Sequence, residues 1–185
     1  TFNGYGPSFD TQADGSHFYS PFYHDSIYRI IGDKLELEYS FDFGPHYWSG
    51  TDIVNYTNNF RGKGLPAGFM SVGGPFFDLG NYFHFTISHF MDNGKFASYA
   101  CLWNKKEQKL IYFKDNFDDL LFANSSLESV GPNNEWISIV QPIDFLENLD
   151  KIRGNTQFEF SKESISQIQN LREDDNPVIV MFTLK

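Results

Sequence analysis

The sequence predicts a mainly β protein built from antiparallel strands, and three observations support this. Aromatic residues pack well on half-buried pleated surfaces, and the 185 residues include 21 Phe, 10 Tyr and 3 Trp. The 15 Gly and 8 Pro supply the turns that short antiparallel strands need. Several segments also alternate apolar with polar residues, which is the period of two expected for a strand with one buried face.

The first regular element is a hairpin around the turn Gly32-Asp33. Residues 26–31 lead into this turn, and residues 34–44 follow it with alternating apolar and polar side chains. Because alternate side chains share one face of a strand, we expect one set to form a core face. That set is Leu35, Leu37, Tyr39, Phe41 and Phe43.

Three further strands form a predicted antiparallel meander over residues 82–90, 95–103 and 109–113. The Asn93-Gly94 pair is a strong turn signal between the first two of them. The single cysteine, Cys101, lies in the middle strand, so we expect a buried, unreactive thiol.

The remaining segments are assigned from their apolar spacing. Residues 45–75 read as an irregular connection, in which residues 52–60 form a short helix or turn. The later expectations are strands at 120–123 and 136–140, helices at 142–149 and 161–171, and a closing strand at 178–184 that is buried on both faces. Hydrophobic patterning also predicts a set of core positions. They are Ile27, Leu37, Phe41, Phe85, Ile87, Tyr99, Ile111, Ile139, Val180 and Phe182.

The composition argues against two classes of partner. The formal net charge is −10, whereas nucleic-acid binding depends on Lys and Arg that neutralise phosphates. No segment has the apolar length of a transmembrane helix, so we expect no membrane span.

The order of the motifs resembles six-bladed β-propeller proteins of Bacteroides-type bacteria. Residues 24–30 (HDSIYRI) and 39–44 (YSFDFG) are similar to a hairpin of that family, and residues 175–180 (DNPVIV) are similar to its terminal strand. Meanders at blade-sized spacing agree with this resemblance. It implies antiparallel meander blades amounting to about half of a six-bladed ring, with two short helices near the C-terminus.

The resemblance also implies a domain plan and a location. Residues 1–185 form a single domain or part of one, with a loop-like or loosely extended segment at 1–16 and propeller blades at 17–185. The family implies a place in the cell envelope, facing outward and lipid-anchored in the full-length protein. Half a ring would leave open blade edges, through which the chain could associate with itself.

The candidate binding site lies on the long irregular connection. His46, Tyr47, Trp48 and Arg61 combine aromatic faces with a guanidinium, a set that stacks on sugars or grips carboxylates. The alternative is that Tyr47 and Trp48 fill the gap between neighbouring blades.

No catalytic residue, metal site or cofactor is predicted. His84 and His89 are five residues apart in a strand and therefore point to opposite faces, so they cannot share a metal unaided. The sequence thus favours a non-catalytic envelope module that binds a protein, peptide or glycan. The alternatives are a propeller hydrolase or lyase with a channel-facing active site, and a purely structural assembly module.

Overall fold

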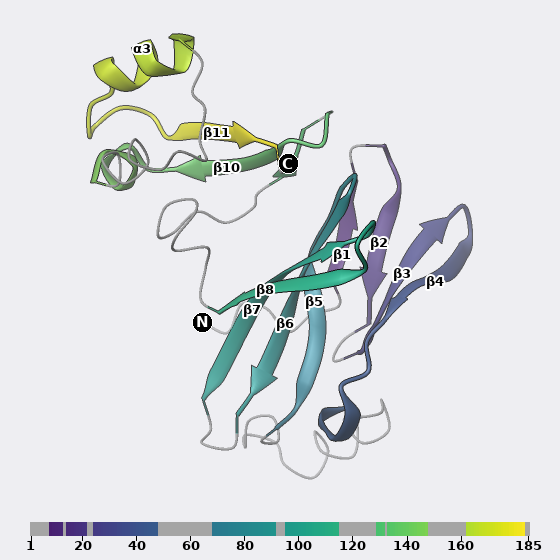
Figure 1. The fold of residues 1–185 in the computed structure, drawn as a ribbon. Coiled ribbons are helices and arrows are strands. Elements are labelled where there is room, and N and C mark those ends of the chain that lie inside the picture. The colour runs from purple at the N-terminus through teal and green to yellow at the C-terminus, as the bar shows by residue number, and fades with distance from the viewer. Residues whose placement is uncertain are drawn as a thin grey trace. The chain divides into compact units, whose positions relative to one another are not determined.

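The computed structural model describes residues 8–12, 14–21, 24–47, 68–91, 95–114, 129–131, 133–147 and 162–183. Within these ranges every strand pairing is antiparallel, and the strands form two four-stranded sheets and one three-stranded sheet (Figure 1). Two short helical segments accompany the last sheet. The predicted class, mainly antiparallel β with two short helices near the C-terminus, is confirmed.

The chain divides into two units, Thr1–Asp115 with Pro132–Asn134 and Asn116–Gly131 with Glu135–Lys185. The single-domain organisation stays a prediction. In the first unit the strands are β1 (Ser8–Thr11), β2 (His17–Ser20), β3 (Ser26–Ile31), β4 (Lys34–Ser40), β5 (Met70–Leu79), β6 (Tyr82–Phe90), β7 (Phe96–Asn104) and β8 (Lys109–Lys114), with the 3-10 helix η1 (Gly44–His46) after β4. The second unit contains β9 (Ser129–Val130), β10 (Trp136–Val140), a helical segment at 142–147, α3 (Lys162–Asn170) and β11 (Val178–Phe182).

Both four-stranded sheets are simple meanders, in the orders β1-β2-β3-β4 and β5-β6-β7-β8. The predicted hairpin around Gly32 and the predicted three-strand meander are both confirmed. β1 shows that residues 8–11 of the N-terminal segment are extended rather than looped. β5 begins at Met70, inside the stretch expected to be irregular. The Gly73-Gly74-Pro75 run, which favoured a loop, instead lies at a register shift within this strand.

The core of the first unit lies between its two sheets. It is made of aromatic and aliphatic side chains from both meanders: Phe18, Ile27, Val72, Phe76, Phe83, Phe85, Ile87 and Cys101. The ring of Tyr39 stacks on Phe83, with centroids 4.5 Å apart, and Phe41 lies against Phe85 at 4.7 Å. The burial of Cys101 was predicted and is confirmed.

The side chains of Asp10 in β1 and of Gln12, just after it, bond to the edge of β5 that does not pair with β6. The Phe76 amide donates to Asp10 Oδ2 at 3.0 Å, and the Asp78 amide donates to Gln12 Oε1 at 2.8 Å. Gln12 Nε2 donates in turn to the Phe76 carbonyl at 2.8 Å. An edge strand would otherwise leave these backbone groups without partners, so these bonds join the two sheets.

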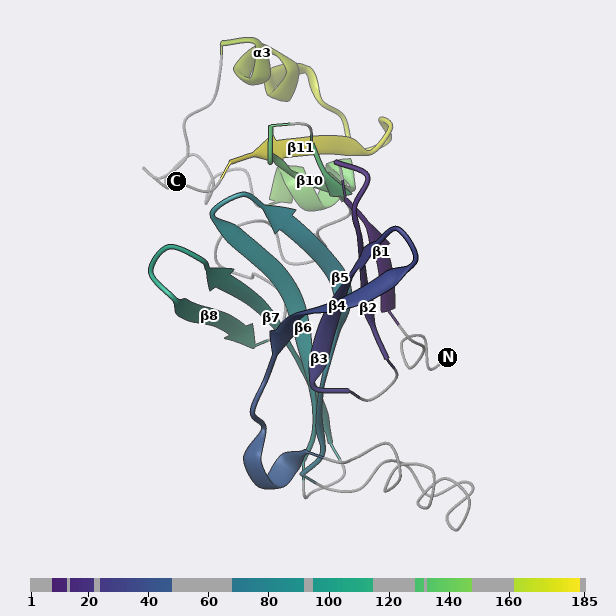
Figure 2. The same cartoon turned by 90° about the vertical axis from the view of Figure 1, so that its right-hand side faces the viewer.

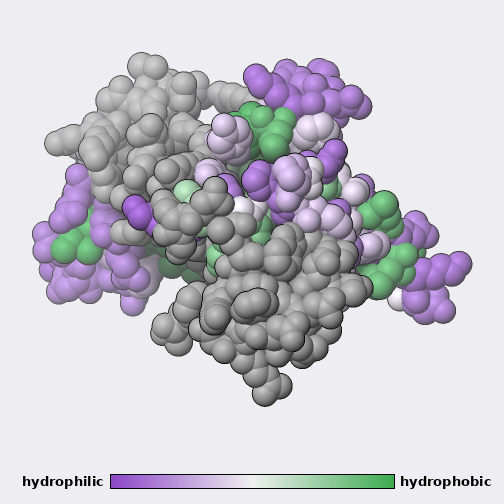
Figure 3. Space-filling model, turned by 90° about the horizontal axis from the view of Figure 1, so that it is seen from below, coloured by the Kyte–Doolittle hydropathy of each residue, from purple (hydrophilic) through white to green (hydrophobic). Residues whose placement is uncertain are grey.

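The prediction that Leu37 lies in the core is wrong, because β4 contains a bulge. Ile27 pairs with Tyr39 but its neighbour Tyr28 pairs with Leu37, so Glu38 is an extra residue in β4. The bulge moves Leu35 and Leu37 to the face opposite Ile27, where Leu37 is 60% exposed. Figure 3 shows hydrophobic surface on this hairpin, at the right of the view.

The predicted burial of β11 on both faces is also wrong. Ile179 is 65% exposed, and Met181 and Ile139, the cross-strand partner of Ile179 on β10, are exposed as well, so the prediction that Ile139 lies in the core is also wrong. The positions of the strand at 136–140 and of both helices are confirmed within the ranges that the structure describes. The strand expected at 120–123 and the helix or turn expected at 52–60 lie outside those ranges.

Candidate functional site

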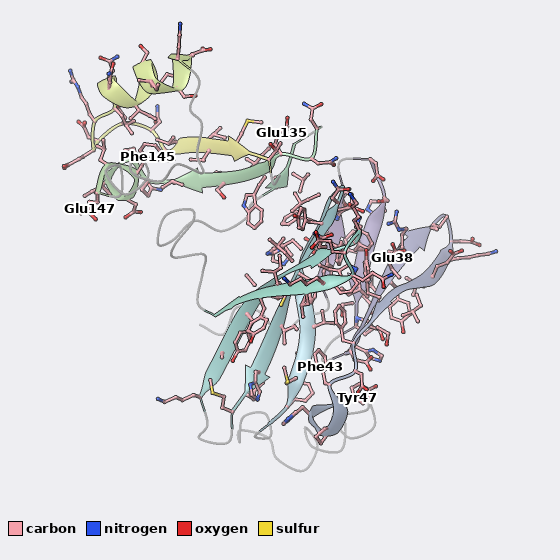
Figure 4. The ribbon with its side chains drawn as sticks, in the orientation of Figure 1. Glu38, Phe43, Tyr47, Glu135, Phe145 and Glu147 are labelled. Carbon is pink, nitrogen blue, oxygen red and sulfur yellow. The ribbon has the colours of Figure 1, made fainter. Side chains whose placement is uncertain are left out.

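Tyr47 lies at one end of the strands of the first unit (Figure 4). Its neighbour His46 contacts Gly68, just before β5, and His89, near the end of β6. The turn that holds them is specified locally. The Gly44 amide donates to Asp42 Oδ1 at 2.8 Å, and Gly44 adopts a φ of +54°, a conformation that suits a residue without a Cβ. Pro45 then sets the backbone of the first turn of η1.

His46 is fixed by a hydrogen bond from its ring to the backbone. Its Nδ1 lies 2.6 Å from the carbonyl oxygen of Gly68. Since a carbonyl can only accept, Nδ1 carries the proton, and Nε2 is the lone-pair atom of the neutral ring. The ring packs edge-to-face with His89, with centroids 5.8 Å apart.

Tyr47 is held beside a third histidine. Its ring meets the ring of His24 edge-to-face, with centroids 6.4 Å apart, and the residue is 37% exposed. The Tyr47 amide donates to the Gly44 carbonyl, which closes the η1 turn beneath it. An aromatic side chain that is both held and open to solvent can serve as a stacking surface for a ligand.

His24 continues into a short polar cluster with Asp25 and Ser26. His24 Nδ1 lies 3.1 Å from Asp25 Oδ1, although the two atoms are not in hydrogen-bonding geometry. Ser26 is buried, and its hydroxyl donates to the same Asp25 oxygen at 2.7 Å. Because the serine proton points to the carboxylate and not to a histidine, these three residues do not form a nucleophile with its base.

The structure therefore brings together two predicted residues, His46 and Tyr47, with two that the sequence did not indicate, His24 and His89. Trp48 and Arg61, the other predicted members, lie outside the described residues. His24 lies just before β3, and His89 lies near the end of β6. The sequence signal that could have indicated these two histidines was their position at the ends of predicted strands. Whether these residues bind a ligand stays a prediction.

Among the described residues, no group of three or more His, Cys, Asp or Glu side chains is placed to hold a metal ion. The helices in that part of the chain are too short or too polar to cross a membrane. The expectation of no cofactor stays a prediction.

A second charged cluster lies on the hairpin β3–β4 and β5. Arg29 forms a two-point pair with Glu38, with Nη2–Oε1 and Nε–Oε2 distances of 3.0 Å and 3.2 Å, and its guanidinium lies 4.9 Å from the centre of the Phe18 ring. Lys105 Nζ lies 2.6 Å from Asp78 Oδ1. The hydrogen bond to Glu38 raises the pKa of Arg29. These contacts pair opposite charges with one another, which is the arrangement of a structural network.

Comparisons with known proteins indicate the fold. No protein-family model matches the sequence, and a search of curated proteins found no match. The structure is similar to the crystal structure of a "putative exported protein" from Bacteroides fragilis, with a TM-score of 0.55 and 12% sequence identity. The match covers 96% of this chain and 49% of that one, so the chain spans about half the length of the protein it resembles.

Proposed function

We propose that the chain is part of a non-catalytic β-propeller module of the cell envelope, which binds a protein, peptide or glycan at the end formed by His46 and Tyr47. The two four-stranded meanders support the propeller architecture, since such a sheet is the repeating unit of a propeller blade. The likeness to an exported Bacteroides protein supports an outward-facing location. Lipid anchoring of the full-length protein belongs to the same proposal.

The observation that carries the proposal is the exposed ring of Tyr47. Its edge-to-face contact with His24 and the hydrogen bond of neighbouring His46 to Gly68 both restrain the turn. Binding to a ring that is already restrained costs less conformational entropy, so a ligand that stacks on it binds more tightly. His46, the residue before Tyr47, is also exposed, so the same turn offers an aromatic ring for stacking and a ring nitrogen for hydrogen bonding.

An array that displays glycans and peptides tests this site. The probe is the labelled wild-type chain, compared with the Tyr47→Ala variant. Tyr112→Ala is the matched control, because Tyr112 is an exposed tyrosine on β8. We expect specific array positions to bind the wild-type and control chains but not the Tyr47→Ala variant. Equal binding by all three chains would show that the ligand binds elsewhere.

The exposed apolar sheet faces favour a second candidate, a structural assembly module. In the first unit Leu35 and Leu37 are exposed on one sheet face, and in the second unit Ile139 and Ile179 form an exposed cross-strand pair. Apolar patches of this kind are typical of surfaces that other protein covers.

Light scattering tests the assembly candidate. The wild-type chain should have the mass of a dimer or larger assembly, and a Leu35→Lys, Leu37→Lys double variant should have a lower mass. Leu110→Lys serves as the control, since Leu110 is exposed on β8. A monomeric wild type would exclude assembly through these faces.

A further inference from the structure

The sheet β1-β2-β3-β4 is largely apolar on both of its faces. One face carries Phe18 and Ile27, which belong to the core of the first unit. The strand register places two cross-strand rows on the opposite face, and Figure 2 is viewed toward this face, with β3 and β4 in front of β5 and β6. Each row crosses all four strands, and together we call them the first apolar face. The rows are Phe9-Tyr19-Tyr28-Leu37 and Thr11-His17-Ile30-Leu35.

The first apolar face is open to solvent at both edges of the sheet. Phe9 on β1 is 56% exposed, and Leu35 and Leu37 on β4 are 57% and 60% exposed. The ring of Phe9 stacks on the ring of His17, with centroids 5.3 Å apart. A sheet that is apolar on both faces is typical of a position between two layers, so we expect another apolar surface to cover this one.

The sheet of the second unit has an exposed apolar face of its own. Between β10 and β11, Ile137 pairs with Met181 and Ile139 pairs with Ile179. Three of these four side chains are at least half exposed. Trp136, which precedes Ile137 on β10 and points to the opposite side, is buried. We call the two cross-strand pairs the second apolar face.

The charge of the chain favours these two faces as a contact between copies. The formal net charge is −10, so two copies repel one another wherever their acidic surfaces meet. Neither apolar face contains Asp, Glu, Lys or Arg. Sheets pack face to face about 10 Å apart with interdigitating side chains, so one uncharged face can cover the other without bringing like charges together.

The occupant to which these observations point is a second copy of the chain. The chain spans about half the length of the Bacteroides protein that it resembles, so two copies supply a similar length of polypeptide. In a propeller each blade packs on the preceding blade with one face and on the following blade with the other. The two ends of an incomplete set of blades therefore expose two different faces, as the first and second apolar faces are.

We propose that two copies of the chain assemble head to tail, with the first apolar face of each copy packed on the second apolar face of the other. This inference rests on the proposed propeller architecture, and it names the partner surface for the assembly candidate. Contacts between different faces are heterologous, and two of them close a dimer. Four strands and two rows cover roughly 300 Å². Two such contacts bury less than the ~800 Å² per partner of a stable complex, so the dimer should dissociate on dilution.

Two charged variants of the full chain test the contact. The first variant carries Leu35→Lys and Leu37→Lys, and the second carries Ile139→Glu and Ile179→Glu. A dimer of either variant buries unpaired charge at both contacts, whereas a mixture can form one unaltered contact and one Lys–Glu contact. Sedimentation of a dilution series measures the dimer affinity. We expect each variant to dimerise at least tenfold more weakly than the wild type, and the equimolar mixture to dimerise at least tenfold more tightly than either variant alone.

Controls separate this contact from a general effect of charge. Leu110→Lys and Ile165→Glu change exposed aliphatic residues of β8 and α3, outside both faces, and should dimerise like the wild type. Salt at ~1 M should weaken the mixed dimer, which contains Lys–Glu pairs, more than the wild-type dimer. Circular dichroism checks that each variant is folded.

The outcomes distinguish the inference from the proposals on which it rests. A mixture that assembles no better than its components would overturn the head-to-tail contact. A dimer that only the Lys substitutions weaken would also overturn it, because the first apolar face would then pack on itself, but the assembly candidate would stand. A wild-type chain that is monomeric at every concentration would contradict both the inference and the assembly candidate, and would leave the Tyr47 site untouched.

Discussion

Gln12, the residue after β1, is bonded twice to the backbone of β5: Gln12 Nε2 donates to the Phe76 carbonyl at 2.8 Å, and Gln12 Oε1 accepts from the Asp78 amide at the same distance. Gln12 is 7% exposed, so its removal leaves a buried carbonyl and a nearby amide without this partner. We predict that Gln12→Ala lowers the free energy of unfolding by ~1–3 kcal/mol, measured by urea denaturation. Gln169→Ala, an exposed substitution on α3, should change it by less than ~0.5 kcal/mol. Equal effects would show that the bonds between the sheets contribute little.

His84 should make stability depend on pH. Burial lowers its pKa from 6.5 to about 4, and its ring nitrogen Nδ1 lies 3.1 Å from the Pro75 carbonyl. The unfolded chain therefore binds more protons than the folded chain between these two pH values. Stability from this group is fully present above pH 6.5 and is lost as pH falls toward 4, by up to about 3 kcal/mol.

His84→Asn retains a donor near Nδ1 but does not titrate, so the variant should lose this part of the pH dependence. Urea midpoints measured across the window check the prediction. Ile27→Val is the control: Ile27 is buried on β3, whereas His84 is on β6, so the substitution should lower stability at every pH without changing the slope. If the stability of the His84→Asn variant depends on pH as strongly as that of the wild type, other groups cause the pH dependence.

The bulge at Glu38 predicts unequal costs for two aliphatic residues of the same hairpin. Ile27 is fully buried, and Leu37 is 60% exposed. Ile27→Ala should cost ~2–5 kcal/mol because it leaves a cavity, whereas Leu37→Ala should cost less than ~0.5 kcal/mol. Chemical denaturation of both variants measures the difference. A large cost for Leu37→Ala would mean that this face is covered in solution, as the assembly candidate requires.

Cys101 should be unreactive while the protein is folded. It has no exposed surface, and burial raises the pKa of its thiol from 9.0 to about 12. The reactive thiolate is therefore about a thousandfold scarcer than for an ordinary cysteine. A thiol reagent such as DTNB should label Cys101 only after urea unfolds the chain. Rapid labelling of the native protein would show that β7 opens locally.

Alternation and turn residues were sufficient to predict most strands of the first unit. The turn at Gly32 fixed the hairpin β3–β4, and the Lys95–Trp103 segment was correctly placed as a strand at the centre of a meander. Which face of each strand is buried was less predictable. Leu37 follows the same alternation as Tyr39, but the extra residue Glu38 places them on opposite faces, and a bulge of this kind leaves no mark in the apolar pattern.

The candidate site was predicted only in part for a related reason. His46 and Tyr47 stand out because they are adjacent to a Gly-Pro turn. His24 and His89 are distant in sequence and join them only because β3, β5 and β6 have their ends at a common edge: the Val72 amide donates to the His24 carbonyl at 3.0 Å. Burial on β11 was overestimated because an apolar run does not show whether a neighbouring sheet covers it.

The most direct test of the proposed function is to map the binding surface by amide chemical shifts, using the strongest ligand found on the array and the isotopically labelled chain. The account predicts that the largest shifts occur at residues 44–47 and at Gly68, which accepts the hydrogen bond from His46. Smaller shifts should extend to His24 and His89, whose rings contact Tyr47 and His46. Shifts centred on β8 or on α3, with residues 44–47 unchanged, would contradict it.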